Sequence, residues 1–148
     1  MKYINLLFMV ILSFIAMYIL MYVMVDTFAN VYPNLNQLYM AGVMTVPMLL
    51  IEIFLMRSMY HNKKVNTFII IFSLAIFILL IGFIRNQTAI SDKEFLKSMI
   101  PHHAAAILMC EQNQLQDPEI KQLCKTIETT QQSEIDWMKT KLKSLENK

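Results

Sequence analysis

The first 85 residues consist of three long apolar runs separated by short polar stretches. A helix needs about twenty apolar residues to cross a bilayer, and the runs at about residues 4–25, 38–56 and 65–84 are each near this length. The first run is too long for the apolar core of a cleaved signal peptide, and no small-residue cleavage site precedes Asp26. The pattern therefore predicts three membrane-spanning helices, the first of them an uncleaved anchor.

After residue 90 the pattern changes to the helical periodicity of a water-exposed domain. The stretch SDKE at 91–94 has the form of a capping box, and Pro101 either kinks the helix that begins there or starts a new one. This helix is expected to run to about Leu115. A short turn, QDP, then leads through Pro118 into a second helix that extends to about Leu145.

The second helix carries its apolar residues in one stripe at helical spacing, formed by Ile120, Leu123, Ile127, Met138, Leu142 and Leu145. Two such helices joined by a short turn predict a helical hairpin. The expected fold class is therefore all-α: a three-span membrane anchor over residues 1–88, followed by an extramembrane helical hairpin over residues 89–148.

Charge sets the expected orientation of the three spans. The loop after the second run holds Arg57, Lys63 and Lys64, and Lys2 precedes the first run, whereas the loop after the first run has no Lys or Arg. By the positive-inside rule, the N-terminus and the second loop lie in the cytoplasm and residues 86–148 lie outside. Arg85, at the end of the third run, favours the opposite orientation, but the four basic residues named above outnumber it.

Composition narrows the function classes. The net charge of +2 is too small to indicate a nucleic-acid partner. The chain has no phosphate-binding glycine loop, no Ser/His/Asp set and no nucleophile with an evident base. An enzyme is therefore not expected.

Two adjacent histidines after Pro101 are the main candidates for chemistry. At about 100° per residue, His102 and His103 flank a helical line through Met99 and Cys110, and Met109 lies one turn further on. If the hairpin folds near Asp117, residues whose numbers sum to about 234 are level across it. His103 is then level with Gln131, and Glu134 lies within a turn of both histidines.

This spacing leaves two interpretations open. Imidazole and thioether donors suit copper, whereas imidazole and carboxylate donors suit zinc or iron. The structural alternative is that the histidines bond locally near the helix start, with Glu134 as their hydrogen-bond partner. A buried His–Glu pair of this kind satisfies its polar groups without any metal.

The stretches FLKSMIPHHAAAILMC and DPEIKQLCKTIETTQQSEIDWM resemble the bacterial domain of unknown function 305 family. That family's pattern is a His-His pair, an alanine and a methionine on one helix, then Gln-x-x-Glu-Ile-x-x-Met on the next. The corresponding residues cover about residues 90–145 and are His102, His103, Ala106, Met109, Gln131, Glu134, Ile135 and Met138. The three-span leader is similar to the family's membrane-anchored branch.

The resemblance implies a ferritin-like fold and a role in handling copper or another metal. The chain lacks the Glu-x-x-His motif of ferritin-like di-metal sites, so copper(I) is favoured over zinc or iron. The candidate ligands are His102, His103, Met99, Met109, Gln131, Glu134 and Met138. The expected location is the bacterial cytoplasmic membrane, with the C-terminal domain periplasmic or extracellular. The alternative function is a metal-free interaction module of the membrane.

Cys110 and Cys124 also sum to 234 and so lie level across the predicted hairpin. Outside the membrane they could form a disulfide, and otherwise they are free thiols available to copper. The hairpin is also small, and two helices alone cannot bury both their apolar faces. We therefore expect a homodimer that completes a four-helix bundle and brings two sets of candidate ligands toward one core.

Overall fold

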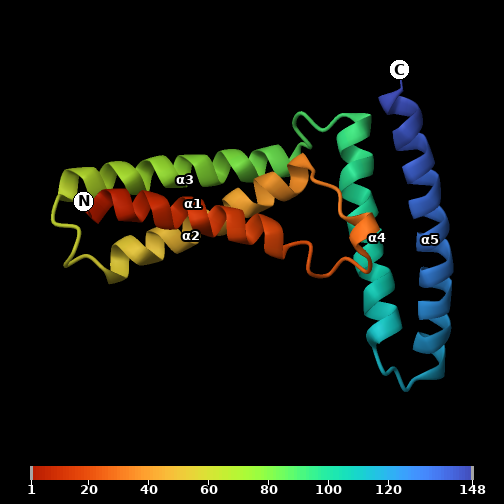
Figure 1. The fold of residues 1–148 in the computed structure, drawn as a ribbon. Helices are drawn as coiled ribbons and strands as arrows, with labels where there is room; N and C mark the ends of the chain where they lie inside the picture. Colours follow the sequence, from red (N-terminus) through yellow and green to blue (C-terminus); the bar gives the residue numbers. More distant parts are fainter. Residues whose placement is uncertain (1, 148) are drawn as a thin grey trace. The chain divides into compact units, whose positions relative to one another are not determined.

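The structure is a computed structural model that describes residues 2–147. In this range all regular secondary structure is helical and there is no strand, which confirms the expected all-α class (Figure 1). The elements in order are α1 (Lys2–Leu20), the short 3-10 helix η1 (Phe28–Asn30), α2 (Leu35–Leu55), α3 (Lys63–Arg85), α4 (Asp92–Gln112) and α5 (Pro118–Glu146).

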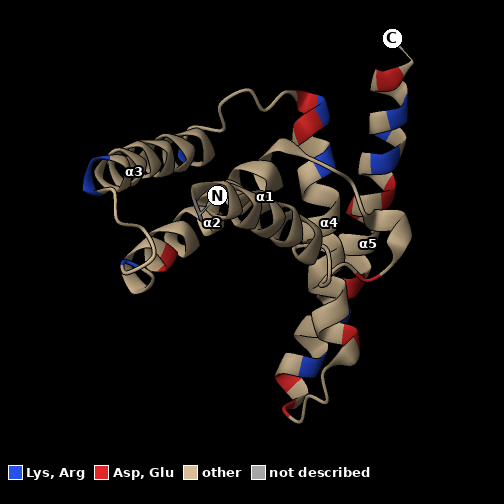
Figure 2. Cartoon of the chain, turned by 60° about the vertical axis from the view of Figure 1, so that its left-hand side comes forward, with Lys and Arg blue, Asp and Glu red and all other residues tan. Residues whose placement is uncertain are grey.

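Three helices, α1, α2 and α3, are long and apolar enough to cross a membrane. Large apolar side chains cover their surfaces; Phe54 and Ile78, for example, are 72% and 70% exposed. Figure 2 shows few charged residues along these helices and many along α4 and α5. Such a continuous apolar surface is rare on soluble proteins, which agrees with the predicted membrane anchor. The side chain of Lys2, which counts toward the predicted orientation, lies outside the described part of the chain.

The chain forms two compact units. The first contains α1, α3 and nearly all of α2, and the second contains α4, α5 and also the segment Tyr22–Leu35. The sequence pattern divides the chain at residue 88 alone, because the apolar run that begins near residue 4 continues to Val25. In the structure α1 ends at Leu20, and Val25 packs against the apolar core of the second unit.

In the first unit, a polar network joins the start of α1 to the loop between α2 and α3. The Tyr3 hydroxyl donates to Asn66 Oδ1 at 2.8 Å, and Asn66 Nδ2 donates to the carbonyl of Tyr60 at 2.8 Å. The buried Tyr60 hydroxyl donates to Glu52 at 3.4 Å. Burial raises the pKa of Tyr60, and the nearby Glu52 carboxylate raises it further. The phenol therefore remains a donor, which suits the carboxylate beside it.

In the second unit, α4 and α5 pack along one apolar seam. Ser91 caps α4 by accepting from the Glu94 amide, as the capping box predicts, and Asp117 caps α5 through the amides of Glu119 and Ile120. Seven buried side chains form the seam: Leu96, Ile100, Ala104, Ile107, Ile135, Met138 and Leu142. Their spacing of three or four residues explains why each helix presents one face to the other.

The predicted apolar stripe of α5 is only partly buried. Met138 and Leu142 lie in the core, but Ile120 and Leu123 are 48% and 57% exposed. In the register that the disulfide fixes, Ile120 lies beyond the end of α4 at Gln112, because α5 is the longer helix, whereas Leu123 is level with Glu111 and is exposed beside the last turn of α4.

Pro101 does not begin a new helix; it lies inside α4. Proline has no amide hydrogen, so the carbonyl of Lys97 loses its usual partner four residues on. The buried Asn34 side chain reaches this carbonyl at 3.5 Å through Nδ2, which also donates to the carbonyl of Tyr32 at 2.9 Å. One turn earlier, the Glu94 carboxylate accepts from the Leu35 amide at 2.9 Å. The segment after α1 thus supplies hydrogen bonds to α4 at the turn that the proline weakens.

Candidate metal-binding site

The imidazole of His103 is the centre of the candidate site. Its side chain lies on the buried face of α4, one residue before Ala104 of the apolar seam, and it is only 8% exposed. Nδ1 lies 2.9 Å from the carbonyl of Met99, one turn back along the same helix. A carbonyl only accepts, so Nδ1 carries the proton in this contact.

The other ring nitrogen of His103 points across to α5. Nε2 lies 2.8 Å from Glu134 Oε2, and the Glu134 side chain is half exposed. Both ring nitrogens therefore face oxygen acceptors, and both contacts are hydrogen bonds when the ring is protonated and the carboxylate is ionised. The contact joins α4 to α5 at the edge of the apolar seam.

Gln131 lies one turn before Glu134 on α5, and residues three apart are neighbours on a helix surface. Its Oε1 atom is buried and has no hydrogen-bond partner. An acceptor left buried without a partner costs about 1–3 kcal/mol. The amide oxygen of Gln131 is therefore available to accept a hydrogen bond or to bind a cation.

The remaining predicted ligands are placed around this pair with different exposures. His102 is exposed, and its ring centroid lies 6.2 Å from that of His103. Met109 is 53% exposed, and Met99 is partly buried against the seam. Met138 is 5% exposed and belongs to the apolar seam itself. The sequence pattern predicts that all these donors meet at one level. In the structure, only His103, Glu134 and the Met99 carbonyl are in direct contact.

No three His, Cys, Asp or Glu side chains come close enough to hold a metal ion within the part of the chain that the structure describes. Metal sites in proteins generally use three or four protein ligands. Any full site that includes His103 therefore needs amide or thioether donors, or ligands from a second chain.

The two cysteines are joined. Cys110 of α4 and Cys124 of α5 form a disulfide, with Cα atoms 5.3 Å apart. Their numbers sum to 234, the register inferred for the turn at Asp117. In this state neither sulfur is a thiolate ligand. The bridge instead fixes the register of α4 against α5 beyond the last buried residue of the seam on α4, Ile107.

One polar residue near α4 carries no signal in the sequence. Asn30 of η1 is 3% exposed, and its Oδ1 atom is buried without a partner, while Nδ2 donates to Asp26 at 2.7 Å. Asn30 follows the first apolar run in a loop with no recognisable motif. Only the packing of η1 against α4 shows that this side chain is buried.

The family model for the domain of unknown function 305 matches residues 84–146. The chain is also similar to the uncharacterized protein L153 of Acanthamoeba polyphaga mimivirus, with 38% identity over 148 residues, 97% of this chain and 95% of that protein. The chain belongs to the domain of unknown function 305 family. The family match covers all of α4 and α5, and the viral relative aligns across α1, α2 and α3 as well. No solved structure matches the chain.

Proposed function

We propose that α4 and α5 form a helical hairpin that binds copper(I) or another soft transition metal on the outer side of a membrane. The observation that carries this proposal is the orientation of His103. Histidine ligands of metals almost always donate the proton of one ring nitrogen to a carbonyl or carboxylate, which leaves the other nitrogen for the metal. The bond from Nδ1 to the Met99 carbonyl supports this role, with Nε2 as the metal-binding atom.

The preference for a soft ion rests on the thioethers among the proposed ligands, because the nearest neighbours of Nε2 are oxygen donors. Glu134 is its nearest neighbour, and Gln131 adds an amide oxygen that has no partner. Met99, whose own carbonyl orients the ring, carries a thioether and is partly buried against the seam. Zinc and iron sites favour additional imidazole or carboxylate ligands, and these are scarce here. A bound ion would replace the present contact between Nε2 and Glu134.

A second copy of the hairpin would complete both the site and the apolar packing. Leu123 and Trp137 of α5 are 57% and 62% exposed, and Met109 of α4 is 53% exposed. Pairing two hairpins would cover such side chains and give the four-helix arrangement of ferritin-like proteins. Each hairpin would contribute His102 and His103 to a common core. Full-length protein should therefore sediment as a dimer in detergent, and a monomer at micromolar concentration would contradict this step.

The orientation proposed for the membrane anchor places α4 and α5 outside. Arg57 lies between α2 and α3, and Lys63 and Lys64 begin α3; all three are exposed, as expected at the cytoplasmic side. The disulfide between Cys110 and Cys124 supports an oxidising compartment for the hairpin. The bacterial cytoplasmic membrane stays a prediction, because the relative described above is encoded by a virus.

A metal-free interaction module is the second candidate. The observation in its favour is that both ring nitrogens of His103 already have hydrogen-bond partners. On this view His103 and Glu134 hold α4 against α5, and the exposed apolar side chains bind a partner.

Copper(I) titration of the full-length protein in detergent, against a chromogenic chelator, distinguishes the two candidates. The parent should take copper from the chelator, and the double variant His102→Ala/His103→Ala should not, while helix content without metal is unchanged. His61→Ala is the matched control, because His61 is exposed and lies in the loop between α2 and α3. Parallel titrations with Zn(II) and Fe(II) should show weaker binding.

Three results would contradict the proposed histidine site. If the parent protein takes no copper from the chelator, the interaction module is the better account. If the double variant binds copper as tightly as the parent, the histidines are not ligands and sulfur donors alone form the site. Loss of helix content in the variant without metal would assign the histidines a structural role.

A further inference from the structure

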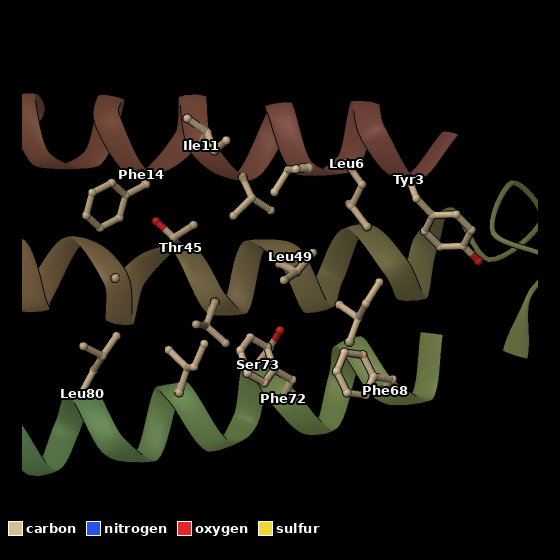
Figure 3. A pocket seen from close by; sticks show the side chains of 16 residues that line it. Tyr3, Leu6, Ile11, Phe14, Thr45, Leu49, Phe68, Phe72, Ser73 and Leu80 are labelled. Atoms are coloured by element: carbon tan, nitrogen blue, oxygen red, sulfur yellow. The ribbon is translucent and has the colours of Figure 1, made fainter. Parts of the chain in front are cut away.

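The first unit contains an apolar groove of about 500 Å³ between its three helices. Figure 3 shows α2 running between α1 and α3, with side chains of all three converging on the groove. Representative lining residues are Ile11 and Phe14 of α1, Thr45 and Leu49 of α2, and Phe68 and Phe72 of α3. The Thr45 hydroxyl donates to the Ala41 carbonyl at 2.7 Å, so its donor is already paired and does not require a polar group in the molecule that fills the groove. The groove therefore suits a hydrocarbon chain.

The length of the groove corresponds to one leaflet of a bilayer. On α1 its lining extends from Tyr3 to Phe14. Eleven steps of 1.5 Å give about 16 Å along the helix axis. Half of a hydrocarbon core about 30 Å thick is about 15 Å. An acyl chain that enters at the membrane surface would thus reach about the middle of the bilayer within this groove.

One end of the groove is basic. A second, shallower hollow of about 440 Å³ is lined by Lys63, Lys64, Thr67, Phe68 and Ile71. Phe68 borders both hollows, so the two lysines lie next to one end of the groove. Both lysines are exposed, and α3 begins at Lys63, which puts their ammonium groups near the membrane surface. This is where a lipid headgroup lies.

We propose that this groove binds an anionic phospholipid, with one acyl chain along α1, α2 and α3 and its phosphate at Lys63 and Lys64. Charge argues against a second copy of the anchor as the occupant. Residues 1–90 contain only two acidic side chains, and both already accept hydrogen bonds, Asp26 from Asn30 and Glu52 from Tyr60. Another anchor would therefore bring no free carboxylate to the two lysines, whereas a phosphate group complements them. The proposal is independent of metal binding by α4 and α5.

Native mass spectrometry of the full-length protein in detergent tests the proposal, with phosphatidylglycerol and phosphatidylcholine of identical acyl chains as probes. The parent should retain phosphatidylglycerol preferentially. Each Lys near a headgroup contributes about 1 kcal/mol, so Lys63→Gln/Lys64→Gln should weaken retention roughly 30-fold. Lys121→Gln/Lys125→Gln is the charge control, because these exposed lysines lie on α5.

A second pair of variants tests the groove itself. Ile11→Trp places a larger ring in the groove and should abolish the phosphatidylglycerol adduct. Ile15→Trp, one turn later on α1 at a position that is also about half exposed but does not line the groove, should retain it. Equal retention of the two lipids by the parent would overturn the proposal. A lipid-free dimer that is disrupted by Ile11→Trp but not by Ile15→Trp would also overturn the proposal. In that case a second copy of the chain fills the groove.

Discussion

The disulfide between Cys110 and Cys124 should provide a large share of the stability of the second unit. The two cysteines are 14 residues apart and close a loop of about 15 residues. In the chain-entropy model, closing such a loop disfavours the unfolded state by about 3 kcal/mol. The total free energy of unfolding of a small domain is only about 5–15 kcal/mol. Replacing both cysteines by alanine should therefore lower the melting temperature of this unit by roughly 12–24 °C.

Trp137 makes this measurement specific to the second unit. It is the only tryptophan in the chain, and it lies on α5. Its fluorescence during heating therefore reports on α5 without a tryptophan signal from α1, α2 or α3. Reductant should lower the transition of the parent to that of Cys110→Ala/Cys124→Ala, and it should not change the variant. A variant that melts within about 3 °C of the oxidised parent would refute the loop-closure argument.

Three further predictions concern packing, topology and the proline turn. Ile135 is fully buried, so Ile135→Ala should lower the free energy of unfolding by about 2–5 kcal/mol, whereas Lys141→Ala, at an exposed position of the same helix, should change it by less than about 0.5 kcal/mol; denaturant unfolding followed by Trp137 fluorescence measures both. A phosphatase fused after Lys148 should be active, because it folds only outside the cytoplasm; activity of a cytoplasm-only reporter there would reverse the assigned orientation. Asn34→Ala should destabilise the second unit by about 1 kcal/mol and by less in a Pro101→Ala background, where an amide can serve the Lys97 carbonyl again; additive losses in a double-mutant cycle would contradict this pairing.

Helix number and position could be predicted from the sequence because each signal is local. Apolar runs gave the three long helices, and Ser91 and Asp117 cap α4 and α5 where polar residues precede periodic ones. The register of α4 against α5 also followed from the turn between them, as the disulfide shows. The position of Pro101 inside α4 could not be predicted, because Asn34, which reaches the carbonyl that Pro101 leaves without an amide partner, is 67 residues away in the sequence.

The candidate site was only partly predictable for a related reason. Helical spacing put His103 and Glu134 on facing surfaces, and the structure brings them into contact. Spacing alone gives no side-chain directions, so it could not separate His102, which is exposed, from His103, which is buried. It also could not show that Met138 packs inside the apolar seam or that Asn30 is buried near α4. These outcomes depend on rotamers and on contacts between distant segments.

X-ray absorption at the copper edge of the copper(I)-loaded full-length protein tests the central proposal most directly, because it identifies the atoms bound to the ion. The account predicts scattering from at least one imidazole ring together with sulfur from a thioether. The imidazole signal should disappear in His102→Ala/His103→Ala and persist in His61→Ala. A spectrum with no imidazole scattering in the parent, or the same imidazole signal in the double variant, would contradict the assignment of His103 as the ligand.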